Sequence, residues 1–319
     1  MKLKCAQMLL MAGAMLLAGC KKPGVAAVDA PAPQDNAGRK QNFTSIEYYG
    51  PTNPTQMKTR LTGADAEPLE NGLIAFKQLK LETFAVSGRT QFIAEAPDCV
   101  YDAPNGTASS SGHLQLASGD GKTRVEGDGF LWRRSDSLLT ISNNVKTLIA
   151  SILIATNGAL NVHAQTNLDA TTNVTIISSH SVNFNMNTRT AVYRGDVRVE
   201  DPQMKLTCEL ITASLPPSGG RPDHIVAETN VVIDFTDEGQ TNHVTCDKAI
   251  YDYSVENGMT NETAIFTGHA RAKIAHNAII IGEPLGWNPE IGFFATNETM
   301  IFPQGLESLK GETNLPLIK

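Results

Sequence analysis

A nine-residue pattern that recurs along the chain constrains the fold more than any other feature. The clearest copies are AVYRGDVRV (191–199) and AIFTGHARA (264–272), in which a small or turn-forming pair precedes alternating apolar and polar residues. Alternation of this kind after a turn pair is typical of a half-buried β-strand. Weaker copies are ASSSGHLQL (108–116), LTISNNVKT (139–147), IVAETNVVI (225–233) and FFATNETMI (293–301).

A second motif alternates with the first along the chain. Most of its copies have an aliphatic first residue, a small third residue and an acid in fourth place. The copies are VEGDGFLW (125–132), LTCELITA (206–213), VTCDKAIY (244–251), IIGEPLGW (280–287), IISSHSVN (176–183) and AEAPDCVY (94–101). Two motifs that alternate without skipping predict a repeat architecture of about six strand–turn–strand units.

Helical periodicity with caps is missing after the first 19 residues, so we expect an all-β protein. The repeated units can stack either as a twisted, open β-jellyroll or as a β-solenoid. Residues 73–84 (LIAFKQLKLETF) are compatible with a short helix or with strand, and the alternation that follows them favours strand.

The first 20 residues indicate export and lipidation. Lys2 and Lys4 precede a short apolar run, and the sequence Leu-Ala-Gly-Cys ends at Cys20. A basic start, a short apolar core and small residues before the cleavage point are typical of a secretory signal. The tetrapeptide resembles the bacterial lipobox, which implies an acylated Cys20 that holds the chain on a membrane. Lys21 in the next position favours the outer membrane by the enteric sorting rule, with the inner membrane as the alternative.

The charge of the chain argues against nucleic acid as a partner. The formal net charge of −7 becomes −9 once the signal, with Lys2 and Lys4, is removed. Binding to phosphate backbones requires clustered basic residues, and the sequence has no basic cluster. The low aromatic content of 6% also argues against a sugar-binding cleft built on stacked rings.

The three cysteines that follow Cys20 leave two alternatives open. Cys208 and Cys246 occupy the same position of consecutive copies of the second motif. Side chains on neighbouring rungs would lie about 4.8 Å apart, within range of a disulfide. The alternative, which we favour, is that both are small buried residues, like Gly127 at the equivalent position.

Residues with catalytic or metal-binding spacing are not found. The seven histidines lack metal-ligand spacing, and His113 and His269 occupy turn positions. The chain has no nucleophile elbow and no phosphate-binding loop. We therefore expect no enzymatic activity, no metal and no cofactor. The recurring acids of the second motif are expected to lie on a solvated strand face: Asp128, Glu209, Asp247 and Glu283.

The repeats resemble a known family. AVYRGDVRVEDPQMKLTCELITASL (191–215) and VTCDKAIYDY (244–253) followed by AIFTGHARAKI (264–274) resemble the OstA/LptA-like proteins of lipopolysaccharide export. The earlier stretches VSGRTQFIAEAPDCVYD (86–102) and VEGDGFLWRRSDSLLTISNNV (125–145) are similar to the related LptC-type domain. The resemblance implies a twisted, V-shaped β-jellyroll that holds the acyl chains of lipopolysaccharide in an apolar groove and joins end to end with other components in the periplasm.

The resemblance also implies a domain organisation. We expect a lipoprotein signal at 1–19, a flexible tether at 20–60 and an LptC-like β-jellyroll at 61–150. An extra rung or linker at 151–173 is expected to lead into an LptA/OstA-like β-jellyroll at 174–302, followed by a loose tail at 303–319.

Alternation places a set of aliphatic residues on one side of their strands, which makes them candidates for the groove. Nine of these residues are expected to form one face, and the other five are expected to face them: Val125, Ile176, Leu206, Val244 and Ile280. The sequence does not separate a groove from a filled core, and the resemblance favours the groove. The candidate residues are Leu114, Leu116, Val125, Val145, Ile176, Val197, Val199, Leu206, Val231, Ile233, Val244, Ala270, Ala272 and Ile280.

The sequence therefore predicts a lipid-anchored component of a lipopolysaccharide transport bridge in the periplasm. Its expected partners are lipopolysaccharide or a related lipid, the membrane through Cys20, and other Lpt components that add a strand to an open sheet edge. The alternative is a structural β-solenoid lipoprotein of the envelope without a lipid ligand.

Overall fold

The computed structural model describes residues 38–50, 53–151, 173–214, 222–237, 239–256, 259–274, 278–295 and 298–301. These residues form nineteen β-strands and one short 3-10 helix, η1 (Glu70–Gly72). No helix in the described ranges is long and apolar enough to cross a membrane. The predicted signal, Cys20, the linker residues 152–172 and the tail 303–319 lie outside the described residues.

The chain divides into two compact units after Thr190. Unit 1 extends past the predicted linker because β8, at its far side, pairs with β7. The strands of unit 1 are β1 (Lys40–Tyr48), β2 (Met57–Pro68), β3 (Leu73–Phe84), β4 (Thr90–Asp102), β5 (Thr107–Ser118), β6 (Thr123–Arg133), β7 (Leu138–Ser151), β8 (Asn173–Ser179) and β9 (Ser181–Asn185).

Unit 2 contains the other ten strands of the described residues. Its strands are β10 (Thr190–Asp201), β11 (Met204–Ser214), β12 (His224–Asp237), β13 (Gln240–Glu256), β14 (Met259–Thr267), β15 (Arg271–Lys273), β16 (Ile279–Gly282), β17 (Leu285–Asn288), β18 (Gly292–Ala295) and β19 (Glu298–Ile301).

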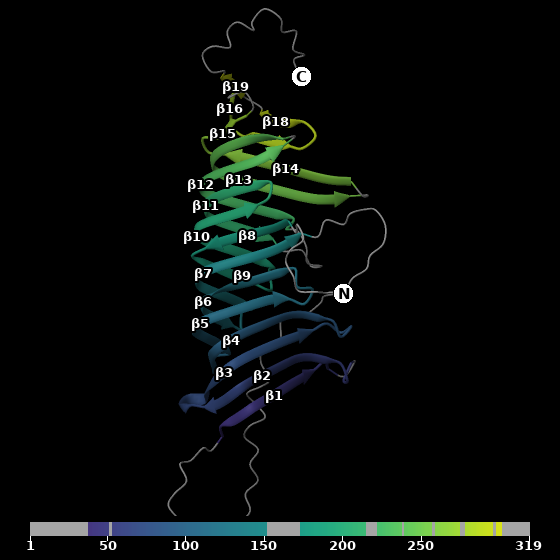
Figure 1. Ribbon diagram of the computed structural model, residues 1–319, viewed down its shortest axis with the longest axis vertical. Helices are drawn as coiled ribbons and strands as arrows, with labels where there is room; N and C mark the ends of the chain where they lie inside the picture. Colours follow the sequence, from purple (N-terminus) through teal and green to yellow (C-terminus); the bar gives the residue numbers. More distant parts are fainter. Residues whose placement is uncertain are drawn as a thin grey trace, which may run out of the picture. The chain divides into compact units, whose positions relative to one another are not determined.

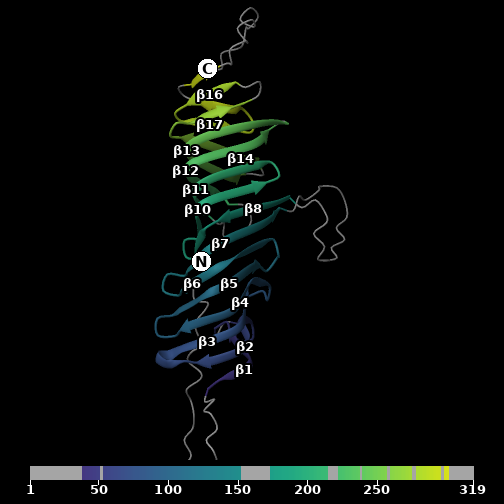
Figure 2. The same cartoon turned by 60° about the vertical axis from the view of Figure 1, so that its left-hand side comes forward.

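Consecutive strands of unit 1 pair antiparallel from β1 to β7, and both β8 and β9 pair with β7. Figures 1 and 2 show these strands following one another in chain order. In unit 2, β11, β12 and β13 pair in the same way, and β13 continues against both β14 and β15. The prediction of an all-β, jellyroll-type fold is confirmed, and residues 73–84 are strand.

The predicted tether is wrong over its second half. Residues 40–48 form β1, which pairs with β2 along its length, and β2 begins at Met57. Most side chains of β1 are exposed or half-buried, so its sequence lacks the apolar alternation that marks the inner strands.

The long strands bend near their middle, and the bend folds the sheet of each unit lengthwise. On β6 the buried residues are Val125 and Gly127 before the bend and Phe130 after it, so the buried positions change from odd to even. The register shifts at the same places, as at Glu126/Asp128 on β6 and Glu228/Val231 on β12. A shift of this kind is a β-bulge, which bends a strand and reverses which side faces inward.

The bends give each unit two walls whose inner faces pack together. We call wall A the part of the sheet that carries Leu116 and Val125 in unit 1 and Ile233 and Val244 in unit 2. Wall B is the part on the other side of the bends.

In four copies of the first motif the turn pair lies at the bend inside one strand, whereas Gly268 and His269 lie between β14 and β15. Gly195 and Asp196 have φ values of 78° and 45° within β10, and Thr229 and Asn230 have values of 70° and 55° within β12. Positive φ is the conformation that a bulge needs and that glycine and asparagine tolerate best. The predicted strand–turn–strand unit is therefore one bent strand in these copies.

Candidate functional site

The recurring acids of the second motif stabilise the bends. Asp128 lies at the bend of β6, where its carboxylate is 2.9 Å from His113 Nδ1 on β5 and accepts a hydrogen bond of 2.8 Å from the Asn144 amide on β7. These two hydrogen bonds lower the pKa of Asp128. The acid thus joins its own bend to the turn-pair bends on both neighbouring strands.

Unit 2 repeats this arrangement with its own acids. The Glu283 carboxylate accepts a hydrogen bond of 3.1 Å from the Gly268 backbone N–H, and His269 Nδ1 lies 2.9 Å from Asp247 Oδ2. Glu209 accepts from the backbone N–H of Asp196 at 3.4 Å. No group of three potential metal ligands occurs among the described residues. The acids and the turn histidines are therefore partners of one another along the bends.

We expect the His269–Asp247 pair to make unit 2 more stable at low pH. The hydrogen bond to Asp247 raises the pKa of His269 above its usual value of about 6.5. A raised folded-state pKa contributes stability that is complete below the unfolded pKa and is lost as the pH rises through the folded pKa. Urea unfolding of the natural protein and of His269→Gln should show the variant less stable at pH 5.5 and equally stable at pH 9. Asp247→Asn, which changes the other partner of the pair, serves as the matched control. A stability difference between His269→Gln and the natural protein that persists unchanged at pH 9 would contradict this origin.

The cysteines are free and buried. Cys99, Cys208 and Cys246 form no disulfide. Cys208 lies on β11 and Cys246 on β13, with β12 paired between them, so the expectation of neighbouring rungs is wrong. Two strand spacings separate them by about 9.6 Å, beyond the reach of a bridge.

Five of the candidate groove residues of unit 2 form one continuous row rather than two facing sets. Leu206 on β11 is in register with Ile233 on β12, and Ile233 is in register with Val244 on β13. The row continues to Ala272 on β15 and Ile280 on β16. Directly opposed residues of an antiparallel pair lie on the same face of the sheet. Val244, Leu206 and Ile280 therefore belong to wall A together with Ile233, contrary to the expectation that they face it.

The facing surface in unit 2 is wall B, which the sequence analysis did not list. Its inner residues are Ile211, Ala227, Ala249, Phe266 and Leu285, and all of them are buried. In strands that carry the second motif, these residues come after the bend. In strands that carry the first motif, they come before it. The change in alternation across the acid of the second motif was the signal that could have found them.

The candidate groove residues of unit 2 are closely packed, whereas Phe235, Trp287 and Phe293 at the strand ends are half-buried. Val197, Val244 and Ala272 have no exposed surface, and the remaining candidates of this unit are at most 8% exposed: Val199, Leu206, Val231, Ile233, Ala270 and Ile280. At the outer ends of the strands, the ring of Phe235 on β12 lies 5.1 Å from that of Trp287 on β17, and Phe293 lies 6.1 Å from Phe235. This aromatic contact joins wall A to wall B.

The candidate groove residues of unit 1 differ in how far they are buried. Leu114, Val125 and Val145 are buried on wall A, and Leu116, which is in register with Val125, is half-buried. Ile176 differs from the expectation because it pairs with Leu148, in the row that continues to exposed Arg124. Its side chain therefore lies on the outer face, and the adjacent Ile177 takes the inner position opposite Thr147.

Wall B of unit 1 carries a row of aromatic and aliphatic side chains. Tyr101 on β4 is in register with Ala108 on β5, which is opposite Trp132 on β6. The row continues to Leu139 on β7 and Phe184 on β9. Tyr101, Ala108 and Leu139 are buried, whereas Trp132 and Phe184 are half-buried.

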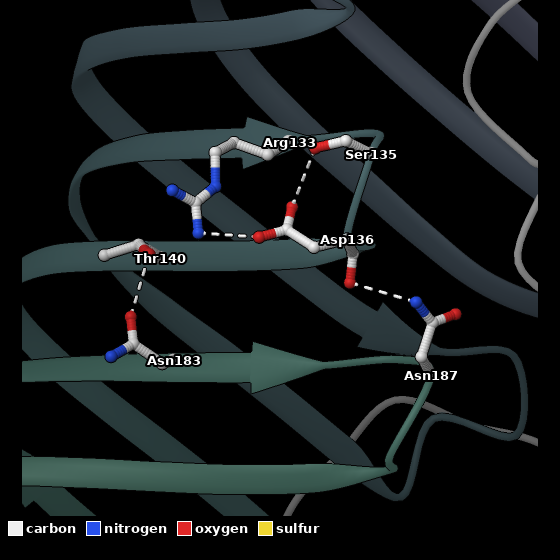
Figure 3. A network of polar contacts seen from close by, with 6 residues as sticks. All are labelled: Arg133, Ser135, Asp136, Thr140, Asn183 and Asn187. Carbon is white, nitrogen blue, oxygen red and sulfur yellow. Dashed lines mark hydrogen bonds and ion pairs between the residues drawn. The ribbon is translucent and has the colours of Figure 1, made fainter.

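Polar contacts at the edge of this wall hold β9 against β7 (Figure 3). The Thr140 hydroxyl donates a hydrogen bond of 2.7 Å to Asn183 Oδ1, and the Asn187 amide donates one of 3.1 Å to the backbone carbonyl of Asp136. Asp136 also accepts from Arg133 at 2.7 Å, across the turn between β6 and β7. These contacts fix the position of Phe184 beside Leu139.

Comparisons with known proteins give distant likenesses among solved structures. No family model matches the chain, and no curated protein matches it. Among solved structures, the chain is similar to LptH from Pseudomonas aeruginosa, described as the LptA homologous periplasmic component of the lipopolysaccharide transport device. The two share 14% identity over 40% of this chain and 94% of that one, with a TM-score of 0.35. At this distance, the functional argument has to come from the residues themselves.

Proposed function

We propose that the protein binds an acylated lipid of the lipopolysaccharide class between the walls of unit 1, as a lipid-anchored component of lipopolysaccharide transport in the periplasm. The observation that carries the proposal is apolar surface that the inner face of unit 1 leaves uncovered. Leu116, Trp132 and Phe184 lie on inner rows of unit 1 and are only half-buried.

The exposed surface inside unit 1 is apolar and lies on both walls. On wall A, half-buried Phe92 pairs with Ser118 and half-buried Ile149 pairs with Thr123, in the row next to Leu116 and Val125. Covering such surface with an acyl chain is favourable by about 25 cal/mol per Å². Binding of this kind needs no catalytic group, and we propose no enzymatic activity.

The location and the partners of the protein complete the proposal. The sequence of residues 1–20 supports export and acylation of Cys20, and Lys21 favours the outer membrane. The proposed protein partners are other transport components, which would add a strand at an end of the sheet, where backbone donors and acceptors are available.

Photo-crosslinking in the native host tests the proposal. A photoreactive residue at Leu116 should form adducts with lipopolysaccharide because this side chain lies on the half-open inner face of unit 1. The matched control is Gln115, which is the next residue on the same strand and is exposed on the outer face. Val199, which is only 8% exposed in unit 2, should also give no adduct. Equal labelling at Gln115 and Leu116, or none at Leu116, would contradict the proposal.

A structural role without a lipid ligand is the second candidate, and the close packing of the candidate residues in unit 2 favours it. Under that function, the half-buried residues of unit 1 are only the rim of a dry core. Purified protein that binds neither lipid A nor a hydrophobic dye would support this second candidate.

A further inference from the structure

The rim of wall B in unit 1 carries two arginines that have no anionic partner among the described residues. Arg134 lies in the turn between β6 and β7, and Arg189 lies in the turn between β9 and β10. Both residues are exposed, and within the described ranges neither takes part in an ion pair or a side-chain hydrogen bond. A guanidinium group is always charged and offers five donors. Both side chains are therefore available to an acceptor from outside the chain.

Hydrogen bonds join these two turns to each other. The backbone N–H of Met186 donates to the carbonyl of Ser137 at 3.0 Å, and the Asn187 amide donates to the carbonyl of Asp136 at 3.1 Å (Figure 3). Each turn thus holds the other in place. The two arginines consequently belong to one supported part of the rim rather than to two independent loops.

Arg134 lies where the inner face of wall B reaches the rim. It follows Trp132 by two residues, which returns the chain to the same face of the sheet. Its backbone N–H donates to the carbonyl of Gly106 at 3.0 Å, so the pairing of β6 with β5 extends to this residue. Burial raises the pKa of the Tyr101 phenol, and the positive charge of Arg134 acts on that phenol in the opposite direction. The cation is therefore close to the inner row that contains Tyr101 and Trp132.

The carboxylates beside Arg134 are engaged on the outer face. Asp136 accepts a hydrogen bond of 2.7 Å from Arg133, and Asp102 accepts two from Asn105, at 2.7 and 3.0 Å. Arg133 and Asp102 each follow a member of the inner row by one residue, and successive side chains of a strand point to opposite faces. The neighbouring acids thus leave the charge of Arg134 uncompensated at the mouth of the inner face.

The corresponding row of unit 2 carries a carboxylate instead. Tyr253 follows Tyr251, the aromatic residue that closes its copy of the second motif, by two residues, as Arg134 follows Trp132. Glu262 on β14 lies opposite Tyr253, and its Oε1 accepts a hydrogen bond of 2.8 Å from the Tyr251 hydroxyl. A carboxylate repels an anion at a position where the guanidinium of unit 1 attracts one. The charge of the rim therefore distinguishes the two units.

We propose that Arg134, supported by Arg189, binds a phosphate group on the head of the lipid whose acyl chain lies on the inner face of unit 1. The inference rests on the proposed function and deepens it, because it names the headgroup chemistry that unit 1 selects. A planar guanidinium donates two parallel hydrogen bonds to a phosphate. Half-buried Trp132 and Phe184 lie next to the rim on the interior side, so a chain attached to the phosphate would continue onto their surface.

Two detergents with the same alkyl chain separate the headgroup from the chain. Dodecyl phosphate has an anionic head and dodecyl maltoside a neutral one, whereas inorganic phosphate has no chain. Calorimetry measures binding of each to the secreted chain carrying Cys20→Ser, below the concentration at which micelles form. The variants are Arg134→Gln and its combination with Arg189→Gln. The matched control is Arg124→Gln, which removes the same charge from an exposed residue on the outer face of β6.

We expect Arg134→Gln to bind dodecyl phosphate about tenfold more weakly, as for loss of a hydrogen bond to a charged group, and dodecyl maltoside with unchanged affinity. The double variant should bind dodecyl phosphate more weakly still. Arg124→Gln should bind both detergents as the natural residue does. Inorganic phosphate should bind much more weakly than dodecyl phosphate, because it gains nothing from the apolar face.

Unchanged affinity of Arg134→Gln for dodecyl phosphate would overturn the inference, and so would an equal loss of both detergents. An equal loss in Arg124→Gln would also overturn it, since net charge alone would then explain the effect. Inorganic phosphate that binds as tightly as dodecyl phosphate would show a site for free phosphate instead. Each of these results leaves the proposed function standing if Leu116 still crosslinks to lipopolysaccharide. Absence of binding of both detergents, together with absence of Leu116 adducts, would overturn the two together.

Discussion

Replacement of Val244 by aspartate is expected to unfold unit 2. The side chain has no exposed surface and lies between Ile233 and Ala272 in the central row of wall A. A carboxylate in this position has no cation to pair with and loses its hydration. Burial of such a group typically costs more than about 4 kcal/mol, which is comparable to the stability of a whole domain. Circular dichroism and limited proteolysis should show the loss of folded unit 2.

The neighbouring residue provides the control for this variant. Thr245 is on the same strand with the opposite orientation, in register with Arg271 on β15. Thr245→Asp should therefore fold normally, because a new surface carboxylate beside Arg271 costs little. If Val244→Asp also folded normally, the interior of unit 2 would have to be a hydrated groove rather than a packed core.

The three internal thiols are expected to react at least about a hundredfold more slowly than an exposed thiol. Burial raises the pKa of Cys99 to about 12, of Cys208 to about 11 and of Cys246 to about 12. The thiolate is the reactive species, and each unit of pKa lowers its population about tenfold at pH 8. Burial also keeps the reagent away from the sulfur atoms, which slows the reaction further.

Ellman's reagent measures this protection in a chain that carries Cys5→Ser and Cys20→Ser. In denaturant without reductant, all three thiols should titrate rapidly, whereas the native protein should react slowly. Rapid native labelling would show that the interiors open readily. Fewer than three thiols in denaturant would show that a disulfide had formed.

The sequence predicted the repeat and the buried rows but not the path of the chain. Val197 and Val231 were identified by alternation alone, since each follows a turn pair and both are almost fully buried. The bend at Gly195 and Asp196 could not be distinguished from a hairpin turn, because both require residues that tolerate positive φ. The adjacent Ile176 and Ile177 could not be assigned to faces, because two consecutive isoleucines carry no alternation.

The proposed lipid site depended on the structure more than the fold did. Trp132 was visible in the sequence only as the aromatic residue that closes one copy of the second motif. Its inward position follows from the change of alternation at the bend of β6, and the surface it leaves uncovered follows from the packing around it. Neither property can be obtained from spacing or composition, because both depend on which residues of other strands lie opposite.

The contacts of the acids at the bends constrain how such a protein can gain or lose strands in evolution. Asp128 contacts only residues on the two adjoining strands, and Asp247 is bound in the same local way to His269. A duplication or deletion of one acid-bearing strand with one turn-pair strand therefore preserves every such contact at the new junction. Evolution can lengthen or shorten the array by whole hairpins, as in other proteins whose units touch only their neighbours. Single-strand changes would place acid beside acid and are disfavoured.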